Sequence, residues 1–151
     1  MDTEDPTQLE ILRRYQQAIV SQSADNLADL YAVDAVHEVP FLFPGIATQL
    51  EGREQVRFTY RAAWAHSDAQ PQSIRETAVH CSEDGETVVA EQTVVGVLAS
   101  AGQPFEFPGV VVLRVREGEI IHARDYMDGL RVAHTMGRLP AVAAALAKPD
   151  P

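Results

Sequence analysis

Residues 118–129 read Gly-Glu-Ile-Ile-His-Ala-Arg-Asp-Tyr-Met-Asp-Gly, and the fold can be inferred by working outward from this stretch. Glutamate and glycine residues form a turn at its start, and a strand is expected over 120–127. Side chains alternate along a strand, so one face carries Ile121, Ala123, Asp125 and Met127. This face is apolar except for Asp125, which predicts that it turns inward and buries a carboxylate.

A buried carboxylate costs several kcal/mol unless it is paired, hydrogen-bonded or protonated, so chance placement is an unsatisfactory explanation. Two interpretations of Asp125 stay open at this point. The carboxylate is satisfied by backbone N–H groups or by an arginine, or it is a general acid/base whose pKa is raised by desolvation. The sequence favours neither interpretation over the other.

The opposite face of this strand is polar. It carries His122, Arg124, Tyr126 and Asp128. We expect Arg124 to form a salt bridge at the surface or at an interface, with Asp128 as its candidate partner.

Length and composition bound the class of protein. The 151 residues fit one domain over 1–151, which is large enough to fold without a disulfide or a metal. Cys81 is the only cysteine, which excludes a disulfide framework and a cysteine-based zinc site. The formal charge of -10 argues against nucleic acid and anionic membranes as partners. No apolar run reaches transmembrane length and no signal-peptide pattern occurs, so we expect a cytoplasmic protein.

Three helices are expected in the first half of the chain. Thr7 and Glu10 form a capping box at the start of the first helix. Asp25 is the candidate cap of a short second helix. A strand follows over 33–40, and the third helix opens near 51–54 and ends near residue 66.

Aromatic residues gather on these elements. Tyr15 lies on the first helix, and Tyr60 and Trp64 lie on the third. Phe41 and Phe43 stand between two prolines, in an edge strand or a loop that we expect at a pocket mouth or an interface. These five side chains are expected to line one apolar cavity, although a filled helix-to-sheet core is the more common use of such residues.

The second half of the chain is expected to form an antiparallel meander of four strands joined by short turns. The strands are expected at 73–82, 87–98, 105–116 and 120–127. The strand at 87–98 leaves two alternatives open: either Val88, Ala90, Gln92 and Val94 face inward, or Val89, Glu91, Thr93 and Val95 do. Helices on one side of the sheet and a second subunit on the other would explain its apolar faces, so we expect a homodimer.

Other polar groups indicate no second kind of site. His37 and Glu38 are strand neighbours, so one is expected to point into the pocket and the other away from it. Cys81 points opposite to His80 on its strand, and His122 lies on the face opposite to Asp125, which argues against a metal site built from these residues. No Gly-rich phosphate loop follows a strand, and no nucleophile elbow occurs.

The order of elements, taken with Arg124-Asp125-Tyr126-Met127-Asp128 after Gly118 and Ile120, resembles the SnoaL-like branch of the nuclear transport factor 2-like superfamily. This group includes polyketide cyclases, ketosteroid isomerases and limonene epoxide hydrolase. The segment 35–40 followed by 51–54 is also similar to this group. The tail from Met127 to Pro140 resembles the phenazine-biosynthesis members.

The resemblance implies a cone-shaped α+β fold, in which a bent antiparallel sheet wraps around three N-terminal helices and leaves an apolar cavity. It also implies a C-terminal helical extension and dimers formed through the outer face of the sheet. In polyketide cyclases the Asp that matches Asp125 is the acid/base in the cavity. The chain departs from limonene epoxide hydrolase, since 87–95 holds neither its Arg nor its second Asp. It departs from the phenazine members at Thr59, where they carry His, and at Asp125, where they carry Glu.

The combined expectation is a cofactor-independent enzyme of secondary metabolism that acts on an apolar, carbonyl-bearing small molecule. Asp125 would move a proton in an isomerisation, a cyclisation or a hydrolysis. The expected substrate-binding residues are Tyr15, His37, Phe41, Phe43, Tyr60, Trp64, Gln92 and Met127. The alternative is a non-catalytic ligand-binding or dimerisation module with the same fold.

Overall fold

The computed structural model describes residues 4–41 and 47–149. Its helices are α1 (Gln8–Ser21), α2 (Ala24–Ala28), α3 (Arg53–Ala65), α4 (Gly129–Thr135) and α5 (Leu139–Leu146). Its strands are β1 (Tyr31–Glu38), β2 (Gln49–Glu51), β3 (Ala69–Cys81), β4 (Thr87–Leu98), β5 (Pro104–Arg116) and β6 (Glu119–Met127).

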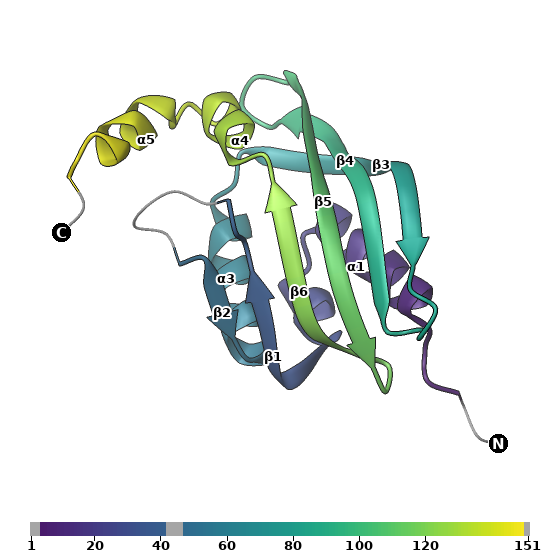
Figure 1. The fold of residues 1–151 in the computed structure, drawn as a ribbon. Helices are drawn as coiled ribbons and strands as arrows, with labels where there is room; N and C mark the ends of the chain where they lie inside the picture. The colour runs from purple at the N-terminus through teal and green to yellow at the C-terminus, as the bar shows by residue number, and fades with distance from the viewer. Residues whose placement is uncertain (1–3, 42–46, 150–151) are drawn as a thin grey trace.

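The strands within the described residues form one sheet in the order β2-β1-β6-β5-β4-β3. Strands β3, β4, β5 and β6 pair antiparallel with one another in chain order, which confirms the predicted meander. Strand β1 joins the other edge of β6 in parallel, and β2 adds an antiparallel edge to β1. Figure 1 shows the sheet bending around α1, α2 and α3, which lie against one of its faces. This architecture is the expected cone-shaped α+β fold.

Side-chain hydrogen bonds define where the first two helices begin. The Thr7 hydroxyl accepts from the Glu10 backbone N–H at 3.2 Å, and the Glu10 carboxylate accepts from the Thr7 N–H at 2.7 Å. This confirms the predicted capping box, a motif whose cap is typically worth about 1 kcal/mol. The cap of α2 is Ser23, not Asp25 as predicted, because α2 begins at Ala24, two residues earlier than an Asp25 cap would place it, and the Ser23 hydroxyl accepts from the Asn26 N–H.

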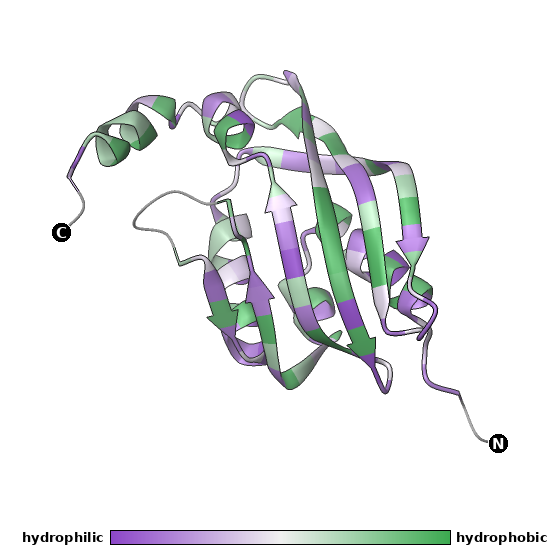
Figure 2. Ribbon diagram, in the orientation of Figure 1, coloured by the Kyte–Doolittle hydropathy of each residue, from purple (hydrophilic) through white to green (hydrophobic). Residues whose placement is uncertain are grey.

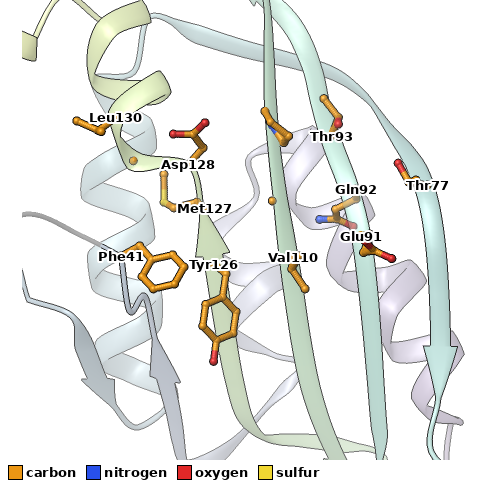
Figure 3. A pocket seen from close by; sticks show the side chains of 13 residues that line it. Phe41, Thr77, Glu91, Gln92, Thr93, Val110, Tyr126, Met127, Asp128 and Leu130 are labelled. Atoms are coloured by element: carbon orange, nitrogen blue, oxygen red, sulfur yellow. The ribbon is translucent and has the colours of Figure 1, made fainter.

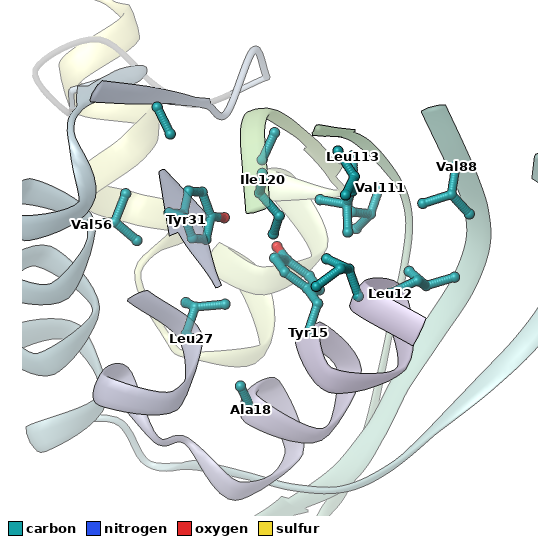
Figure 4. Packing of buried hydrophobic residues seen from close by; sticks show 14 of the residues in the cluster. Leu12, Tyr15, Ala18, Leu27, Tyr31, Val56, Val88, Val111, Leu113 and Ile120 are labelled. Atoms are coloured by element: carbon teal, nitrogen blue, oxygen red, sulfur yellow. The ribbon is translucent and has the colours of Figure 1, made fainter. Parts of the chain in front are cut away.

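The concave face of the sheet and the helices enclose the main hydrophobic core. Figure 4 shows Leu12 and Tyr15 of α1 turned toward Val88, Val111 and Leu113 of the sheet. All five side chains are at most 3% exposed. Burying an aliphatic side chain of this size typically contributes about 1.5–3 kcal/mol, so this face of the sheet is strongly specified.

The structure decides between the two alternatives for β4. Val88 and Ala90 are fully buried in the core, Gln92 is 7% exposed, and Glu91 between them is exposed. The first alternative is therefore the correct one, with Val88, Ala90, Gln92 and Val94 on the concave face. The concave face consequently includes a buried amide.

A bulge in β6 changes one predicted side-chain direction. The sequence predicts Ile121 on the inner face, but the fully buried isoleucine is Ile120. Two adjacent residues of β5 pair with residues 120 and 122, which leaves Ile121 as an extra residue in the ladder. A bulge of this kind shifts the alternation by one position. From Ala123 onward the predicted faces hold, and Asp125 points to the concave side.

The C-terminal helices extend beyond the sheet, as expected for this group. Gly137, with φ of +70°, lies between α4 and α5 in a backbone conformation that favours glycine. No residue of α5 is buried, and Figures 1 and 2 show it as a mostly apolar helix that projects from the body of the molecule. No helix in the described ranges combines the length and apolar character needed to cross a bilayer.

Candidate active site

A cavity of about 310 Å³ lies between the concave face of the sheet and helices α1 and α3. Side chains from α4 and from the residues just after it complete the wall. The helices and the residues shortly after them contribute Tyr15, Ile19, Gln22, Tyr60, Ala63, Trp64, Ser67, Val132, Met136 and Arg138. Those from the sheet are Ala69, Pro71, Gln92, Val94, Phe105, Phe107, Pro108, Gly109, Val111, Asp125 and Met127. The lining is predominantly apolar with a few polar groups, as is usual for small-molecule sites.

Asp125 is the carboxylate of this cavity. It pairs with Val111 across the ladder, and its side chain keeps partial exposure because it borders the cavity. Within the described residues, no hydrogen bond or ion pair reaches its carboxylate. Desolvation raises the pKa of Asp125 from 3.8 to about 6. The group is thus poised to exchange a proton near neutral pH.

Three tyrosines lie near enough to the carboxylate for its charge to act on them. Burial is the main cause that raises the pKa values of Tyr15, Tyr31 and Tyr60, and the charge of Asp125 raises them further. All three therefore keep their protons and can act as hydrogen-bond donors. The Tyr15 hydroxyl is buried and makes no geometrically acceptable hydrogen bond to the described residues, although Tyr31 lies close enough to influence its pKa.

His37 ties two of these tyrosines together behind the cavity. Its Nδ1 lies 2.8 Å from the Tyr31 hydroxyl, and its Nε2 lies 2.9 Å from the Tyr60 hydroxyl. Desolvation lowers the pKa of His37 to about 4, so the imidazole is neutral at pH 7. A neutral imidazole offers one donor and one acceptor, so one tyrosine donates to His37 and the other accepts from it. The accepting tyrosine keeps a hydroxyl proton for another partner.

The structure brings most of the expected site residues together. Tyr15, Tyr60, Trp64, Gln92, Met127 and Asp125 all border the same cavity. His37 turns inward while Glu38 reaches His122 on the other face, as the sequence predicts, but His37 is fully buried behind the tyrosines and does not line the cavity. Its place on β1 sets it one layer away from the ligand space. Phe43 lies outside the described residues.

Phe41 lies outside the internal cavity, contrary to the prediction. It is 64% exposed and contacts Tyr126, with ring centroids 5.3 Å apart. Tyr126 alternates with Asp125 and therefore points to the outer face, which places Phe41 there too. Figure 3 shows both rings at an outer groove of about 610 Å³, bordered also by Val110 and Leu130.

Arg124 does not form the expected salt bridge with Asp128, which pairs with Arg131 instead. Asp128 accepts a hydrogen bond from the Arg131 backbone N–H at the start of α4 and forms an ion pair with the Arg131 side chain at 3.4 Å. These contacts turn Asp128 toward the helix and away from Arg124. The Nε atom of Arg124 has no hydrogen-bond partner among the described residues.

Several cavity residues were not identified from the sequence. Phe105 and Phe107 stack with centroids 4.3 Å apart, and both line the cavity on β5. The alternation that buries Val111 and Leu113 would have found them if it had been extended toward the start of that strand. Val132, Met136 and Arg138 enter from the C-terminal extension, which carries no local signal for this placement.

Within the described ranges, no three His, Cys, Asp or Glu side chains lie close enough together to hold a metal ion. The polar side chains that line the cavity are Asp125, two tyrosines, Trp64, Ser67, two glutamines and Arg138. This set can bind an oxygen-bearing molecule and move a proton.

Sequence comparison gives a family match over most of the chain. The family model described as the SnoaL-like domain matches residues 12–123. An uncharacterised PhzA/B-like protein of Pseudomonas aeruginosa is 30% identical over 138 residues, which are 89% of this chain and 93% of that protein.

Solved structures give the same fold. The crystal structure of a candidate isomerase from Bacillus subtilis aligns with a TM-score of 0.77 and 25% identity, over 86% of this chain and 92% of that one. A Catenulispora acidiphila protein with a ketosteroid isomerase-like fold, solved in complex with trimethylamine, aligns with a TM-score of 0.67 and 24% identity. That alignment covers 87% of this chain and 95% of the other.

Proposed function

Since this chain belongs to the SnoaL-like domain family, we propose that it is a cofactor-independent enzyme acting on a small, apolar, carbonyl-bearing molecule. The internal cavity binds the substrate, and Asp125 is the general acid and base. The reaction class is a proton-transfer reaction: an isomerisation, an aldol-type cyclisation or a hydrolysis.

The observation that carries this proposal is a desolvated carboxylate that faces an apolar cavity and has no partner among the residues that the structure describes. A structural Asp at this position would be hydrogen-bonded or ion-paired, because an unsatisfied buried charge is costly. Asp125 has neither kind of contact among the described residues, and burial raises its pKa to about 6. A group with that pKa is mostly ionised at neutral pH and still strong enough as an acid to return the proton.

The proton transfer follows from this placement. The Asp125 carboxylate accepts a proton from a carbon next to the substrate carbonyl, and the electrons of that C–H bond move onto the carbonyl oxygen. A hydroxyl proton of Tyr15 or Tyr60 stabilises the resulting oxyanion. The Asp125 carboxyl then returns its proton to a different carbon of a conjugated enolate, which completes an isomerisation. In a cyclisation the enolate carbon instead attacks an internal carbonyl carbon, and the oxygen of that carbonyl takes the proton from Asp125 to become a hydroxyl group.

The test uses a ketone probe, because its carbon-bound protons report base catalysis without knowledge of the natural substrate. In D₂O, the protein should speed exchange of the protons next to the carbonyl of 2-indanone, as followed by NMR. The Asp125→Asn variant should lose this acceleration, by about 10²-fold or more. Asp34→Asn is the matched control, since Asp34 is exposed and lies on β1 away from the cavity lining. Equal exchange rates in the wild type and Asp125→Asn would overturn the assignment.

A further inference from the structure

A row of four polar side chains connects the protein surface to the cavity. Arg13 and Glu76 form an ion pair at the outer end. The side-chain Nε2 of Gln16 donates to the Glu76 carboxylate at 2.8 Å and to the side-chain Oε1 of Gln92 at 2.9 Å. The Arg13 guanidinium donates to the side-chain Oε1 of Gln16 at 3.2 Å. Gln16 and Gln92 are 9% and 7% exposed, so the inner half of this row is shielded from bulk solvent.

These contacts fix the direction of both amides. Reversing the Gln16 amide would place its carbonyl oxygen against the Glu76 carboxylate and its N–H groups against the Arg13 guanidinium. Hydrogen bonds from Gln16 and Arg13 lower the pKa of Glu76, which keeps it ionised and accepting at neutral pH. Because the oxygen of the Gln92 amide is held by Gln16, its nitrogen is the end left for the cavity. Gln92 therefore presents a hydrogen-bond donor to a ligand.

Gln92 and Asp125 lie on different strands with β5 between them. Gln92 is in register with Gly109, and Gly109 with Met127, whereas Asp125 pairs with Val111. Two strand spacings put the backbones of β4 and β6 on the order of 10 Å apart. Gly109 has no side chain, and a Cβ there would come within 3.1 Å of the Tyr126 carbonyl oxygen. No side chain therefore rises from β5 between Gln92 and Met127, so backbone forms this part of the cavity floor.

We propose that Gln92 is a specificity-determining residue that binds an acceptor oxygen of the substrate on the β4 side of the cavity. Gln16 and the Arg13–Glu76 pair are positioning residues that keep the amide nitrogen turned toward that oxygen. The substrate is then an apolar molecule, about two fused rings long, with a carbonyl or ether oxygen remote from the carbon that reacts at Asp125. The reaction at Asp125 rests on the proposed function, whereas the contact with Gln92 does not.

The test compares two probes of the same shape, 2-acetylnaphthalene and 2-isopropenylnaphthalene, which differ in having a C=O or a C=CH₂ group. Their dissociation constants are measured by NMR titration on the intact protein. We expect the ketone to bind roughly three- to tenfold more tightly than the alkene, the range that one hydrogen bond gives. Gln92→Met should abolish this preference, and Gln16→Met should reduce it without changing the affinity for the alkene.

Gln22→Met is the matched control. Gln22 lines the same cavity, but its amide nitrogen already donates to the Ala69 carbonyl oxygen at 3.1 Å. The ketone preference should survive this substitution. It should also survive Asp125→Asn, so a failed proton-transfer assignment leaves the result on Gln92 intact.

A second measurement needs no substitution. The side-chain amide signals of Gln92 should shift when the ketone binds and stay in place when the alkene binds. The proposal is overturned if the wild type shows no ketone preference, if Gln92→Met leaves the preference unchanged, or if Gln22→Met by itself abolishes it. An unchanged preference in Gln16→Met would remove the positioning role.

Discussion

The Tyr60 hydroxyl lies 2.9 Å from Nε2 of His37, which ties a residue of the cavity wall to an imidazole that does not reach the cavity. The same imidazole holds Tyr31 through Nδ1. Helix α3 is joined to β1 in this way beside Ala123 of β6, two residues before Asp125. The buried His37 therefore sets the orientation of the Tyr60 hydroxyl, which can donate a hydrogen bond to a ligand.

Asp125→Asn should stabilise the folded protein at pH 7. The folded state disfavours the ionised carboxylate, since burial raises its pKa from 3.8 to about 6. Removing the charge should raise the free energy of unfolding by up to about 3 kcal/mol, an upper limit because the cavity admits water. Urea denaturation measures this, with Asp34→Asn as a control expected within about 0.5 kcal/mol of the wild type. A marked loss of stability in Asp125→Asn would show that Asp125 has a structural role.

The pH dependence of stability should contain two opposing contributions. His37 titrates near 6.5 when unfolded and near 4 when folded, so between these values the unfolded chain binds more protons and acidification destabilises the protein. Asp125 titrates near 3.8 when unfolded and near 6 when folded, so between these values the folded chain binds more protons and acidification stabilises it. The two effects should largely cancel between about pH 4 and 6 in the wild type.

Single substitutions should separate these contributions. Relative to the wild type, Asp125→Asn should lose stability more steeply on acidification from pH 6 to 4. His37→Gln should lose it less steeply, because glutamine can still meet both tyrosine hydroxyls but does not titrate. Unfolding free energies measured across this range test both slopes, and parallel curves for the three proteins would contradict the two pKa shifts.

Tyr60→Phe should affect both stability and chemistry. The change leaves Nε2 of the buried His37 without its partner, which typically costs about 1–3 kcal/mol. If Tyr60 also stabilises the oxyanion, turnover of a ketone should fall by roughly 10²- to 10³-fold. Tyr126→Phe is the control, because Tyr126 points to the outer face. Normal turnover in a folded Tyr60→Phe protein would assign the donor role to Tyr15.

We predict a homodimer that covers the outer face of the sheet. Phe41 and Leu130 are 64% and 58% exposed beside the outer groove, and Val110 lies on its floor. Exposed apolar patches of this kind are typical of interfaces. Sedimentation should find a dimer at micromolar concentration and a monomer for Val110→Arg. Val33→Arg, at an exposed site away from that groove, should leave the association unchanged, and a monomeric wild type would refute the prediction.

The elements fixed by neighbours in the chain were predictable from the sequence. The capping box at Thr7 depends on residues three apart, and the meander depends on alternation and short turns. The inward direction of Asp125 followed from the apolar residues two positions before and after it. Within each element, local periodicity and turn chemistry act over a few residues, so the sequence shows them directly.

The amino-acid sequence by itself determined an acidic α+β chain with a meander and a carboxylate turned toward the core. Only the tertiary structure decided that Phe41 lies on the outer face, that His37 stands behind the tyrosines, and that Ile121 bulges. It also decided how Gln92 is held. Gln16 bonds to both Glu76 and Gln92, which lie 60 and 76 positions away from it along the chain. These features depend on desolvation and on the packing of elements that are distant in sequence. The periodicity within a single strand or helix carries no information about either.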